Sequence, residues 1–226
     1  MLITGASTGI GAATARHAVE AGWRVVLAAR SEDKLDALVA ELGEENALAQ
    51  RCDVTDFGQQ EALVAATLER FGRLDAVFAN AGFGAARGFL KEDPEHWRTM
   101  VLTNVLGVAY TIRAVLPHFN EQRKGHFLLT SSVAGRRSMP GSLYSATKWA
   151  VTGMGESLRQ ELRQDEGSET RVTLIEPGMV DTPFFDNRPQ GALEPDDIAR
   201  IVMFVLAQPN RVDINEVLVR PTSQPS

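Results

Sequence analysis

A tyrosine and a lysine stand four residues apart early in the second half of the chain. Tyr144 and Lys148 lie in the stretch GSLYSATKWAVTG, which is typical of a helix, so both side chains would lie on one face. A phenol with its ordinary pKa of about 10 is a poor base at neutral pH, but a neighbouring ammonium favours its ionised form. The spacing therefore suits an acid/base pair, although the same pair is common on solvated helix faces.

A glycine-rich turn opens the chain. The stretch TGASTGIG, residues 4–11, follows a short apolar segment and leads into a helical pattern, the context that a dinucleotide-binding turn requires. Gly5 permits a tight turn, Gly9 lets backbone amides approach a pyrophosphate, and Gly11 lets the helix pack closely on the sheet. An ordinary strand-to-helix turn is the alternative, because the G-x-x-x-G-x-G spacing differs from the standard fingerprint.

The end of the next strand bears on the choice of cofactor. The stretch LAARSEDKL has Arg30 where NAD-binding folds commonly carry a carboxylate. Because an arginine can accommodate the 2′-phosphate of NADP, we predict NADP(H) in preference to NAD(H). Two alternatives stay open: Arg30 lies in solvent at the strand end, or Asp33 turns inward.

Composition excludes several classes of protein. The 226 residues carry a net charge of −6 with a pI near 5.3, which argues against nucleic acid as the main partner. The single cysteine, Cys52, rules out an internal disulfide framework and is expected to be buried. The four histidines, read as surface or helix-end residues, have no metal-ligand spacing. No apolar run approaches the roughly 20 residues of a membrane span, so we expect a soluble, cytoplasmic protein.

The pattern of apolar residues predicts alternating strands and helices. Strands are expected at 24–29, 76–80, 126–131, 171–177 and 216–221, with a further short strand closing at 52–54, and helices at 9–21, 31–42, 56–71, 94–119, 142–165 and 195–208. Asp93 is expected to cap the fourth helix and Pro94 to begin it. The opening MLI is short for a first strand, so either the strand is cut short or residues precede it. The order predicts a single-domain, doubly wound α/β fold over residues 1–226, with a predominantly parallel sheet and helices on both faces.

Taken in order, seven motifs resemble those of the short-chain dehydrogenase/reductase family. They are TGASTGIG (4–11), CDVTD (52–56), NAG (80–82), Asn104, TSSVAG (130–135), YSATK (144–148) and PGMVDT (177–182). The resemblance covers nearly the whole chain. It implies hydride transfer between a nicotinamide cofactor and a carbonyl or secondary alcohol, with Tyr144 as acid/base and Lys148 favouring the phenolate and holding the nicotinamide ribose.

The resemblance also implies roles for a serine and an asparagine. Ser132 would bond the substrate oxygen. Counting back from Tyr144 favours Ser131 instead, whereas the local motif, with Val-Ala-Gly following, favours Ser132. Asn104 would kink its helix and, through a water, complete a proton relay from Lys148. The alternative is an asparagine bonded to nearby backbone, since asparagine is a mediocre residue inside a helix.

The remaining implied residues bind the cofactor or the substrate. The cofactor set is Gly5, Ser7, Thr8, Gly9, Ile10, Gly11, Arg30, Asp53, Val54, Asn80, Ala81, Gly82, Tyr144, Lys148, Pro177, Gly178, Val180 and Thr182. The substrate would meet Ser132, Tyr144, Phe184 and Phe185, with 183–193 as a short substrate loop in which Arg188 could attract an acid. The C-terminal INEVLVRPTSQ resembles members acting on small hydroxy acids or aldehydes.

Further expectations concern the assembly of the protein, its C-terminal tail and the alternative to an enzyme. Family precedent suggests a homodimer or homotetramer through the helices at 94–119 and 142–165, and residues 222–226 are expected to be a frayed tail. A protein that senses NADP(H) without turnover is the alternative to an enzyme, although both Tyr144 and Lys148 are present.

Overall fold

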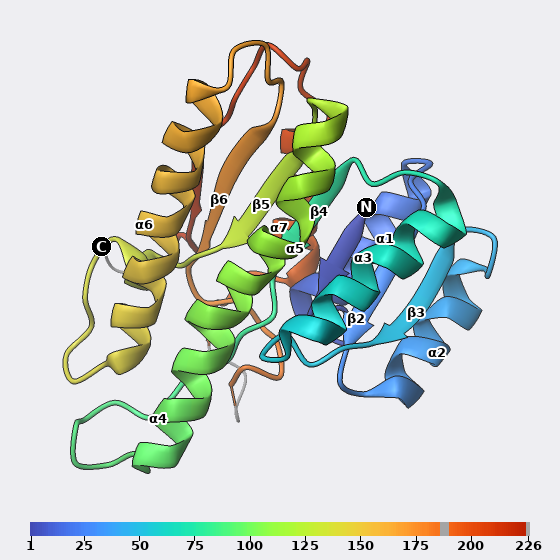
Figure 1. The fold of residues 1–226 in the computed structure, drawn as a ribbon. Coiled ribbons are helices and arrows are strands. Elements are labelled where there is room, and N and C mark those ends of the chain that lie inside the picture. The colour runs from blue at the N-terminus through green and yellow to red at the C-terminus, as the bar shows by residue number, and fades with distance from the viewer. Residues whose placement is uncertain (186–189, 225–226) are drawn as a thin grey trace.

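Seven parallel strands form one sheet in the computed structural model, which describes residues 1–185 and 190–224 (Figure 1). Their order is β3-β2-β1-β4-β5-β6-β7. The strands are β1 (Leu2–Thr4), β2 (Val25–Ala29), β3 (Ala47–Arg51), β4 (Ala76–Ala79), β5 (His126–Thr130), β6 (Arg171–Pro177) and β7 (Glu216–Val219). The order reverses between β1 and β4, so the doubly wound α/β prediction is confirmed.

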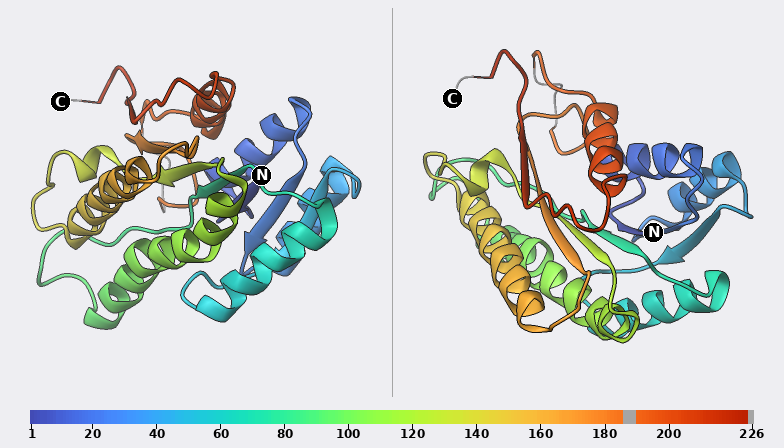
Figure 2. Two further views of the ribbon diagram at one scale, coloured as in Figure 1. Left: turned by 45° about the horizontal axis from the view of Figure 1, so that its top comes forward. Right: turned by 90° about the horizontal axis from the view of Figure 1, so that it is seen from above.

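Helices cover both faces of the sheet (Figure 2). One face packs on α1 (Gly9–Glu20), α2 (Glu32–Leu42) and α7 (Pro195–Leu206), and the other on α3 (Phe57–Phe71), α5 (Gly107–Gln122) and α6 (Leu143–Gln164). Successive strand residues serve opposite faces: Leu27 and Phe78 join the first core, and Val26 and Val77 the second. Burial on both faces explains why these strands read as continuous apolar runs.

One strand prediction was wrong. The third strand lies at Ala47–Arg51, and residues 52–54 follow it in the turn that leads to α3. β3 is an edge strand, paired only with β2, so its outer side needs no continuous apolar run. Cys52 is buried, as expected, and burial raises the pKa of its thiol to about 11.

The fourth predicted helix is longer and less regular than the sequence indicates. It comprises α4 (Pro94–Val101), a π-helical turn at Leu102–Leu106 and then α5. Asp93 caps it as predicted, accepting a hydrogen bond from the Glu95 amide at 2.8 Å. The run Pro94–Gln122 is long and apolar enough to span a membrane by length and composition, contrary to the sequence reading. About a third (33%) of the apolar window is buried, and α5 packs on α3 and the sheet.

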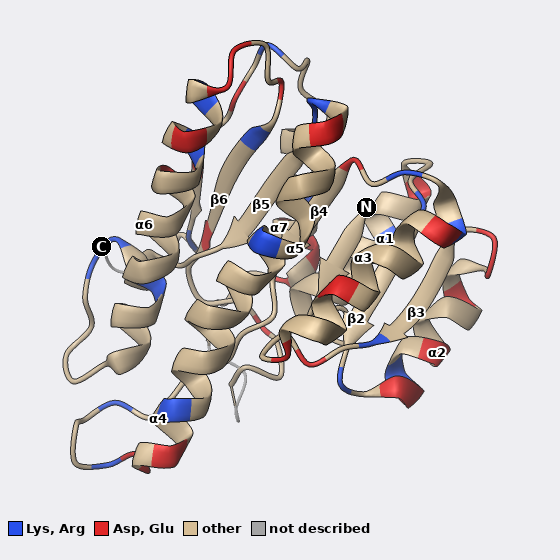
Figure 3. Cartoon of the chain, viewed as in Figure 1, with Lys and Arg blue, Asp and Glu red and all other residues tan. Residues whose placement is uncertain are grey.

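The C-terminal segment returns to the end of β6. Gln224 Oε1 accepts a hydrogen bond from the Met179 amide at 2.9 Å, and Ser223 Oγ donates to the Gly191 carbonyl at 3.1 Å. Charged residues of both signs are interspersed over the helices in the view of Figure 3.

Candidate active site

The glycine-rich turn lies at the carboxyl end of β1. Gly5 and Gly9 have φ of 65° and 54°, a region that favours glycine. A Cβ on Gly11 would stand 2.3 Å from the Gly5 carbonyl oxygen, so the turn and the first residues of α1 tolerate no side chain there. Thr8 at the N-cap makes no side-chain capping bond. The turn with Ser7, Thr8 and Ile10 thus presents a helix N-terminus to solvent, an arrangement that suits a phosphate.

Asn80 fixes this turn against the neighbouring strands. Its side-chain amide donates to the carbonyls of Thr4 and Gly5 at 3.2 and 3.4 Å, and its Oδ1 accepts from Thr130 Oγ1 at 3.3 Å. The amides of Asn80 and Ala81 both donate to Thr4 Oγ1. A Cβ on Gly5 would lie 2.9 Å from Ala81 Cα. Residues 80–82 therefore lie against the glycine turn, and the side chain of Asn80 acts as a brace across β1, β4 and β5.

The opposite wall of the expected adenine site is formed by the segment after β3. Asp53 Oδ1 accepts hydrogen bonds from the amide and hydroxyl of Thr55 at 3.0 and 2.8 Å, and Val54 is buried. Gln60 then ties this segment to the helix that carries Asn104, because its Nε2 donates to the carbonyls of Val54 and Gly107 at 2.7 and 2.9 Å. The segment thus has a fixed backbone shape.

Two arginines lie at adjacent strand ends. Arg30 follows β2, and Arg51, the last residue of β3, pairs in register with Ala29. Neighbouring strands are about 4.8 Å apart, so the two backbones lie close together. Both side chains are exposed, and neither has a hydrogen bond or an ion pair within residues 1–185 and 190–224. Asp33 is exposed in the first turn of α2. The sequence reading missed Arg51, because only the strand register brings it beside Arg30.

Tyr144 and Lys148 lie one turn apart on α6, as the spacing predicts. The Lys148 Nζ is 5.7 Å from the centre of the Tyr144 ring and donates to the Thr130 carbonyl at 2.8 Å. Burial lowers the pKa of Lys148 to about 8, and burial raises the pKa of Tyr144 to about 12. The sequence led us to expect that Lys148 would favour the phenolate. Here burial has the larger effect, since the ammonium faces the end of β5.

Ser132 and Ser131 take different positions. The Ser132 hydroxyl lies near the Tyr144 side chain, where it works against the burial effect on the tyrosine's pKa. The same oxygen accepts from the Ala134 amide at 3.1 Å and donates to the Pro177 carbonyl at 3.3 Å. Ser131 points to α6 instead, bonding the Lys148 carbonyl at 3.0 Å and Thr152 Oγ1 at 2.8 Å. The geometry favours Ser132 as the residue beside Tyr144.

Asn104 is fully buried in the π-helical turn. Its Oδ1 accepts from the Phe83 amide at 3.0 Å, and its Nδ2 donates to the Phe83 carbonyl at 2.9 Å and to Thr147 Oγ1 at 3.2 Å. The irregular helix that the resemblance implied is present. The side chain itself is bonded to nearby backbone, which was the alternative, and it joins the segment after β4 to α6. A Cβ on Gly82 would meet Asn104 Oδ1 at 3.0 Å and Lys148 Nζ at 3.6 Å, so Gly82 keeps the space between them open.

The segment after β6 arches back over the site. Pro177 ends β6, a Cβ on Gly178 would lie 3.1 Å from the Pro221 ring, and Val180 is buried and bridged to Leu193. The Thr182 methyl stands 2.9 Å from where a Cβ on Gly9 would be. Residues 177–182 thus extend from Ser132 to the glycine turn.

Two phenylalanines follow on this arch. The Phe184 ring lies edge-on to the Tyr144 ring at 5.4 Å between centroids, and Phe185 lies edge-on to Phe184 at 5.0 Å. A Cβ on Gly84 would stand 2.6 Å from the Phe184 ring. Both rings keep a large exposed area. Phe184 and Tyr144 therefore share an apolar wall, while Arg188 falls outside the described residues.

One of the four histidines is not a surface or helix-end residue as predicted. His126 is buried in β5, where its Nε2 lies 2.8 Å from Thr173 Oγ1, and burial lowers its pKa to about 3. It lies at the amino end of its strand, away from Tyr144. Within residues 1–185 and 190–224, no group of three or more metal-ligating side chains comes together.

Comparison with known proteins agrees with this geometry. The short chain dehydrogenase family model matches residues 1–192. An uncharacterized oxidoreductase of Listeria monocytogenes is 41% identical over all of this chain and 97% of its own length. An alcohol dehydrogenase of the archaeon Thermococcus sibiricus, complexed with 5-hydroxy-NADP, superposes with a TM-score of 0.92 at 33% identity, covering 100% of this chain and 97% of that one. Serine dehydrogenase of Escherichia coli gives 0.89 at 32% identity, with 100% and 99% covered.

The cofactors of such structures are not uniform. A Burkholderia phymatum short chain dehydrogenase/reductase, in complex with NAD, superposes with a TM-score of 0.87 at 29% identity, covering 96% of this chain and 87% of that one. A nicotinamide dinucleotide is thus the shared feature. Together, the family match, the sheet order and the converging motifs establish that the chain is an oxidoreductase of the short-chain dehydrogenase family.

Proposed function

We propose that this chain reduces the carbonyl group of a small compound with NADPH, and oxidises the matching secondary alcohol in the reverse direction. The observation that carries the proposal is the convergence of Tyr144, Ser132 and Lys148 at the carboxyl ends of β5 and β6, beside the glycine turn. The cofactor, when bound, supplies or accepts the hydride. The protein's own residues hold the carbonyl and deliver the proton.

Tyr144 is the proton donor in this proposal. With its pKa raised to about 12, the phenol is fully protonated at neutral pH and can give its proton to a carbonyl oxygen as that oxygen gains charge. The same pKa makes it a weak base for taking a proton from an alcohol. We therefore propose reduction as the favoured direction near pH 7, and oxidation as increasingly effective in alkali.

Ser132 and Lys148 support that transfer. The Ser132 hydroxyl, which lies near the Tyr144 side chain, is placed to donate to the same substrate oxygen. Lys148 is 4% exposed, so its ammonium acts through a poorly solvated region where charges interact more strongly than in water. With a pKa of about 8, it is mostly charged at pH 7 and loses its charge in mild alkali.

We propose NADP(H) over NAD(H) on the two arginines at the ends of β2 and β3. Arg30 and Arg51 are exposed and without partners in the described chain, and a planar guanidinium can donate two hydrogen bonds at once to the oxygens of a phosphate. The acids Glu32 and Asp33 in the first turn of α2 would repel a 2′-phosphate. A second arginine offsets that repulsion better than Arg30 does alone.

The substrate that fits best is small and partly apolar. Phe184 and Phe185 offer apolar area next to Tyr144, and the similarity to serine dehydrogenase favours a hydroxy acid or the corresponding carbonyl compound. We further propose a cytoplasmic homodimer or homotetramer in which α5 and α6 meet their counterparts. Trp149, 46% exposed on α6, is an apolar side chain that such a contact would cover.

The test begins with the three tryptophans, whose fluorescence is titrated with NADPH and with NADH. Butanal, benzaldehyde, cyclohexanone and 3-oxobutanoate are then assayed through the nicotinamide absorbance. Tighter binding of NADPH, with turnover of at least one probe, supports the proposal. Binding without turnover across a widened panel would favour an NADP(H) sensor, and equal affinity for both cofactors would overturn the NADP preference.

A further inference from the structure

The turn that carries Ser132 is joined to β6 at two points. At its start, Ser132 Oγ donates to the Pro177 carbonyl at 3.3 Å. At its end, Arg136 Nε donates to Glu176 Oε1 at 2.7 Å. Between them runs a single 3-10 turn, Val133–Gly135, closed by hydrogen bonds from the Gly135 amide to the Ser132 carbonyl and from the Arg136 amide to the Val133 carbonyl. The two links thus fasten both ends of a short, closed turn to consecutive residues of one strand.

The second link is an ion pair with one buried member. Glu176 is 1% exposed within a strand whose seven residues are all buried. Burial raises the pKa of Glu176, and the Arg136 guanidinium opposes that shift. Arg136 also pairs with Glu216 on β7, so one side chain joins the serine turn, β6 and β7. Polar groups at the carboxyl end of β6 are thereby tied to the neighbouring strand as well.

Stability alone does not account for this arrangement. A buried ion pair gains little over apolar residues of similar volume, because desolvation offsets most of the attraction. What the pair adds is geometry: it fixes the turn along the strand direction, which a single bond from a serine hydroxyl cannot do. The residues that follow Glu176 are Pro177 and Gly178, where the expected nicotinamide segment begins.

We propose that Arg136 and Glu176 are positioning residues that hold the Ser132 hydroxyl at Tyr144 and in register with Pro177 and Gly178. The inference rests on the proposed function, since it assigns the pair a role through the serine. The Ser132 oxygen takes part in two hydrogen bonds, with the Ala134 amide and the Pro177 carbonyl, and its hydroxyl affects the pKa of the nearby Tyr144. A shift of the turn along β6 would lengthen these contacts and move the hydroxyl away from the reacting oxygen.

A double-mutant cycle between Arg136 and Ser132 tests this role. Arg136→Met and Ser132→Ala are made singly and together, and turnover is measured with NADPH and the fastest of the four carbonyl probes. In the parent protein we expect Arg136→Met to lower kcat about tenfold, a loss typical of a displaced catalytic group. In the Ser132→Ala protein the same change should cost less than about twofold, because the group it positions is already absent. NADPH affinity should stay within about twofold in every variant.

A neighbouring arginine provides the matched control. Arg137 is exposed and has no ion pair among residues 1–185 and 190–224, so Arg137→Met should leave kcat unchanged. Equal losses from Arg136→Met with and without Ser132 would show a merely structural role and overturn the inference. Full turnover in Arg136→Met would overturn it too.

Two further variants serve as a substitute for Arg136→Met and as a separate test of the proposed function. If Arg136→Met does not fold, Glu176→Gln, which keeps the shape and one acceptor oxygen but removes the charge, enters the cycle in its place with the same expected pattern. Full activity of Tyr144→Phe would instead contradict the proposed function itself, independently of the cycle.

Discussion

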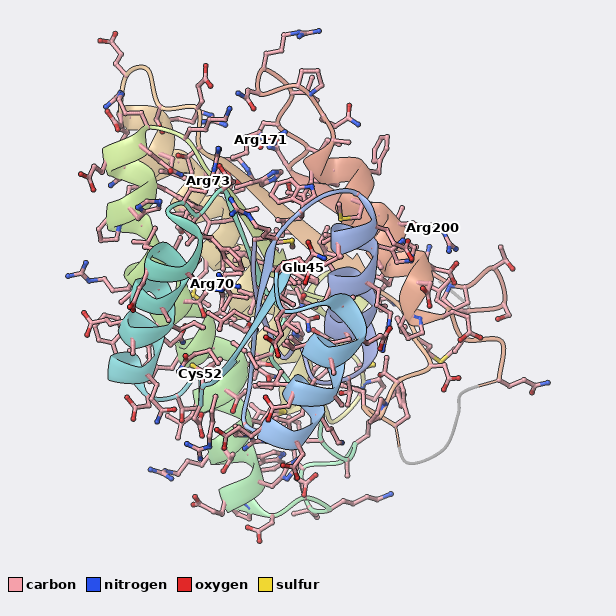
Figure 4. The ribbon with its side chains drawn as sticks, turned by 90° about the vertical axis from the view of Figure 1, so that its right-hand side faces the viewer. Glu45, Cys52, Arg70, Arg73, Arg171 and Arg200 are labelled. Carbon is pink, nitrogen blue, oxygen red and sulfur yellow. The ribbon has the colours of Figure 1, made fainter. Side chains whose placement is uncertain are left out.

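Ionisable groups lie at both ends of the sheet, but their partners differ. At the amino ends, Arg73 and Asp75 pair with each other, and Arg171 donates to the carbonyls of Gln208 and Val212. At the carboxyl ends, Lys148 is buried with the Thr130 carbonyl as its hydrogen-bond partner, and no carboxylate among residues 1–185 and 190–224 pairs with it. Figure 4 shows Arg73 and Arg171 at one end of the molecule and Cys52 toward the other.

This difference between the two ends of the sheet indicates that the carboxyl end carries the active site. A cavity of about 420 Å³ lies at the amino ends, lined by Arg73, Asp75, His126 and Arg171 among others. Asp75 is paired with Arg73 there, and burial lowers the pKa of His126 to about 3, so its imidazole is neutral at pH 7. At the carboxyl ends, Tyr144 and Lys148 have pKa values moved in opposite directions, to about 12 and about 8. Perturbed groups that meet in this way are typical of active sites.

The largest expected effect is the loss of the phenol. Tyr144→Phe keeps the ring that packs on Phe184 but removes the proton donor, so we expect turnover to fall by about 10³-fold or more. NADPH affinity, measured by fluorescence titration, should stay within about twofold. Tyr110→Phe, the same change at the chain's other tyrosine, is the control and should retain full turnover.

Alanine substitutions at the two adjacent serines should have different effects, one on turnover and the other on the free energy of unfolding. Ser132→Ala removes the hydroxyl beside Tyr144, and we expect kcat to fall about 10²-fold with a small change in the free energy of unfolding. Ser131→Ala removes the hydrogen bonds to the Lys148 carbonyl and to Thr152 Oγ1, so it should lose about 1–2 kcal/mol of stability and keep its turnover. Denaturant unfolding and steady-state kinetics on both variants check this. A reversed pattern would make Ser131 the catalytic serine.

Replacing the buried lysine should stabilise the protein while abolishing its activity. The folded state lowers the pKa of Lys148 from 10.5 to about 8, so at pH 7 the buried charge opposes folding by roughly 3 kcal/mol. After about 1 kcal/mol for the lost hydrogen bond to Thr130, Lys148→Met should gain about 2 kcal/mol.

The pH dependence of the free energy of unfolding tests this prediction. Between pH about 8 and 10.5 the unfolded chain binds the lysine proton and the folded chain does not, so wild-type stability from this group rises with pH. The advantage of Lys148→Met should therefore shrink from pH 7 to pH 9.5 in parallel urea titrations. A constant difference would show that folding does not lower the pKa of Lys148, because the folded and unfolded chains would then bind its proton equally over this range.

The smallest expected effect concerns the cofactor's 2′-phosphate. Arg30→Gln and Arg51→Gln should each weaken NADPH binding about tenfold, as expected for one lost charge-assisted contact of roughly 1.5 kcal/mol, and leave NADH binding unchanged. The exposed Arg137 supplies a control substitution of the same kind. If Arg51→Gln matched the control while Arg30→Gln did not, the phosphate contact would belong to Arg30 alone.

Much of the fold is readable from sequence because the central strands are buried on both faces. β6 has the predicted bounds, residues 171–177. β3 was misplaced because an edge strand with the composition ALAQR lacks the apolar run that marks its neighbours. His126 was misread because its burial depends on the strands beside β5, on which its own sequence is silent.

The active-site residues likewise divide into those that local spacing predicts and those that depend on which strands are neighbours. Tyr144 and Lys148 are found through helical spacing, since both lie on one element. Arg51 and the Arg136–Glu176 pair depend on which strands are neighbours, and a single chain carries no local signal of that. The choice between Ser131 and Ser132 likewise required the direction of each hydroxyl.

The π-helical turn at Leu102–Leu106 makes the side chains of the two halves of the helix Pro94–Gln122 face in different directions. Each residue of a regular helix turns the chain by about 100°, and a π turn holds about one residue more than an α turn. The two halves are thereby offset in phase, so α4 faces α6 while α5 faces α3. Deleting one residue, such as Thr103, would restore the regular phase and rotate one half by about 100°. The number of residues in this helix is therefore as important to the active site as their identity.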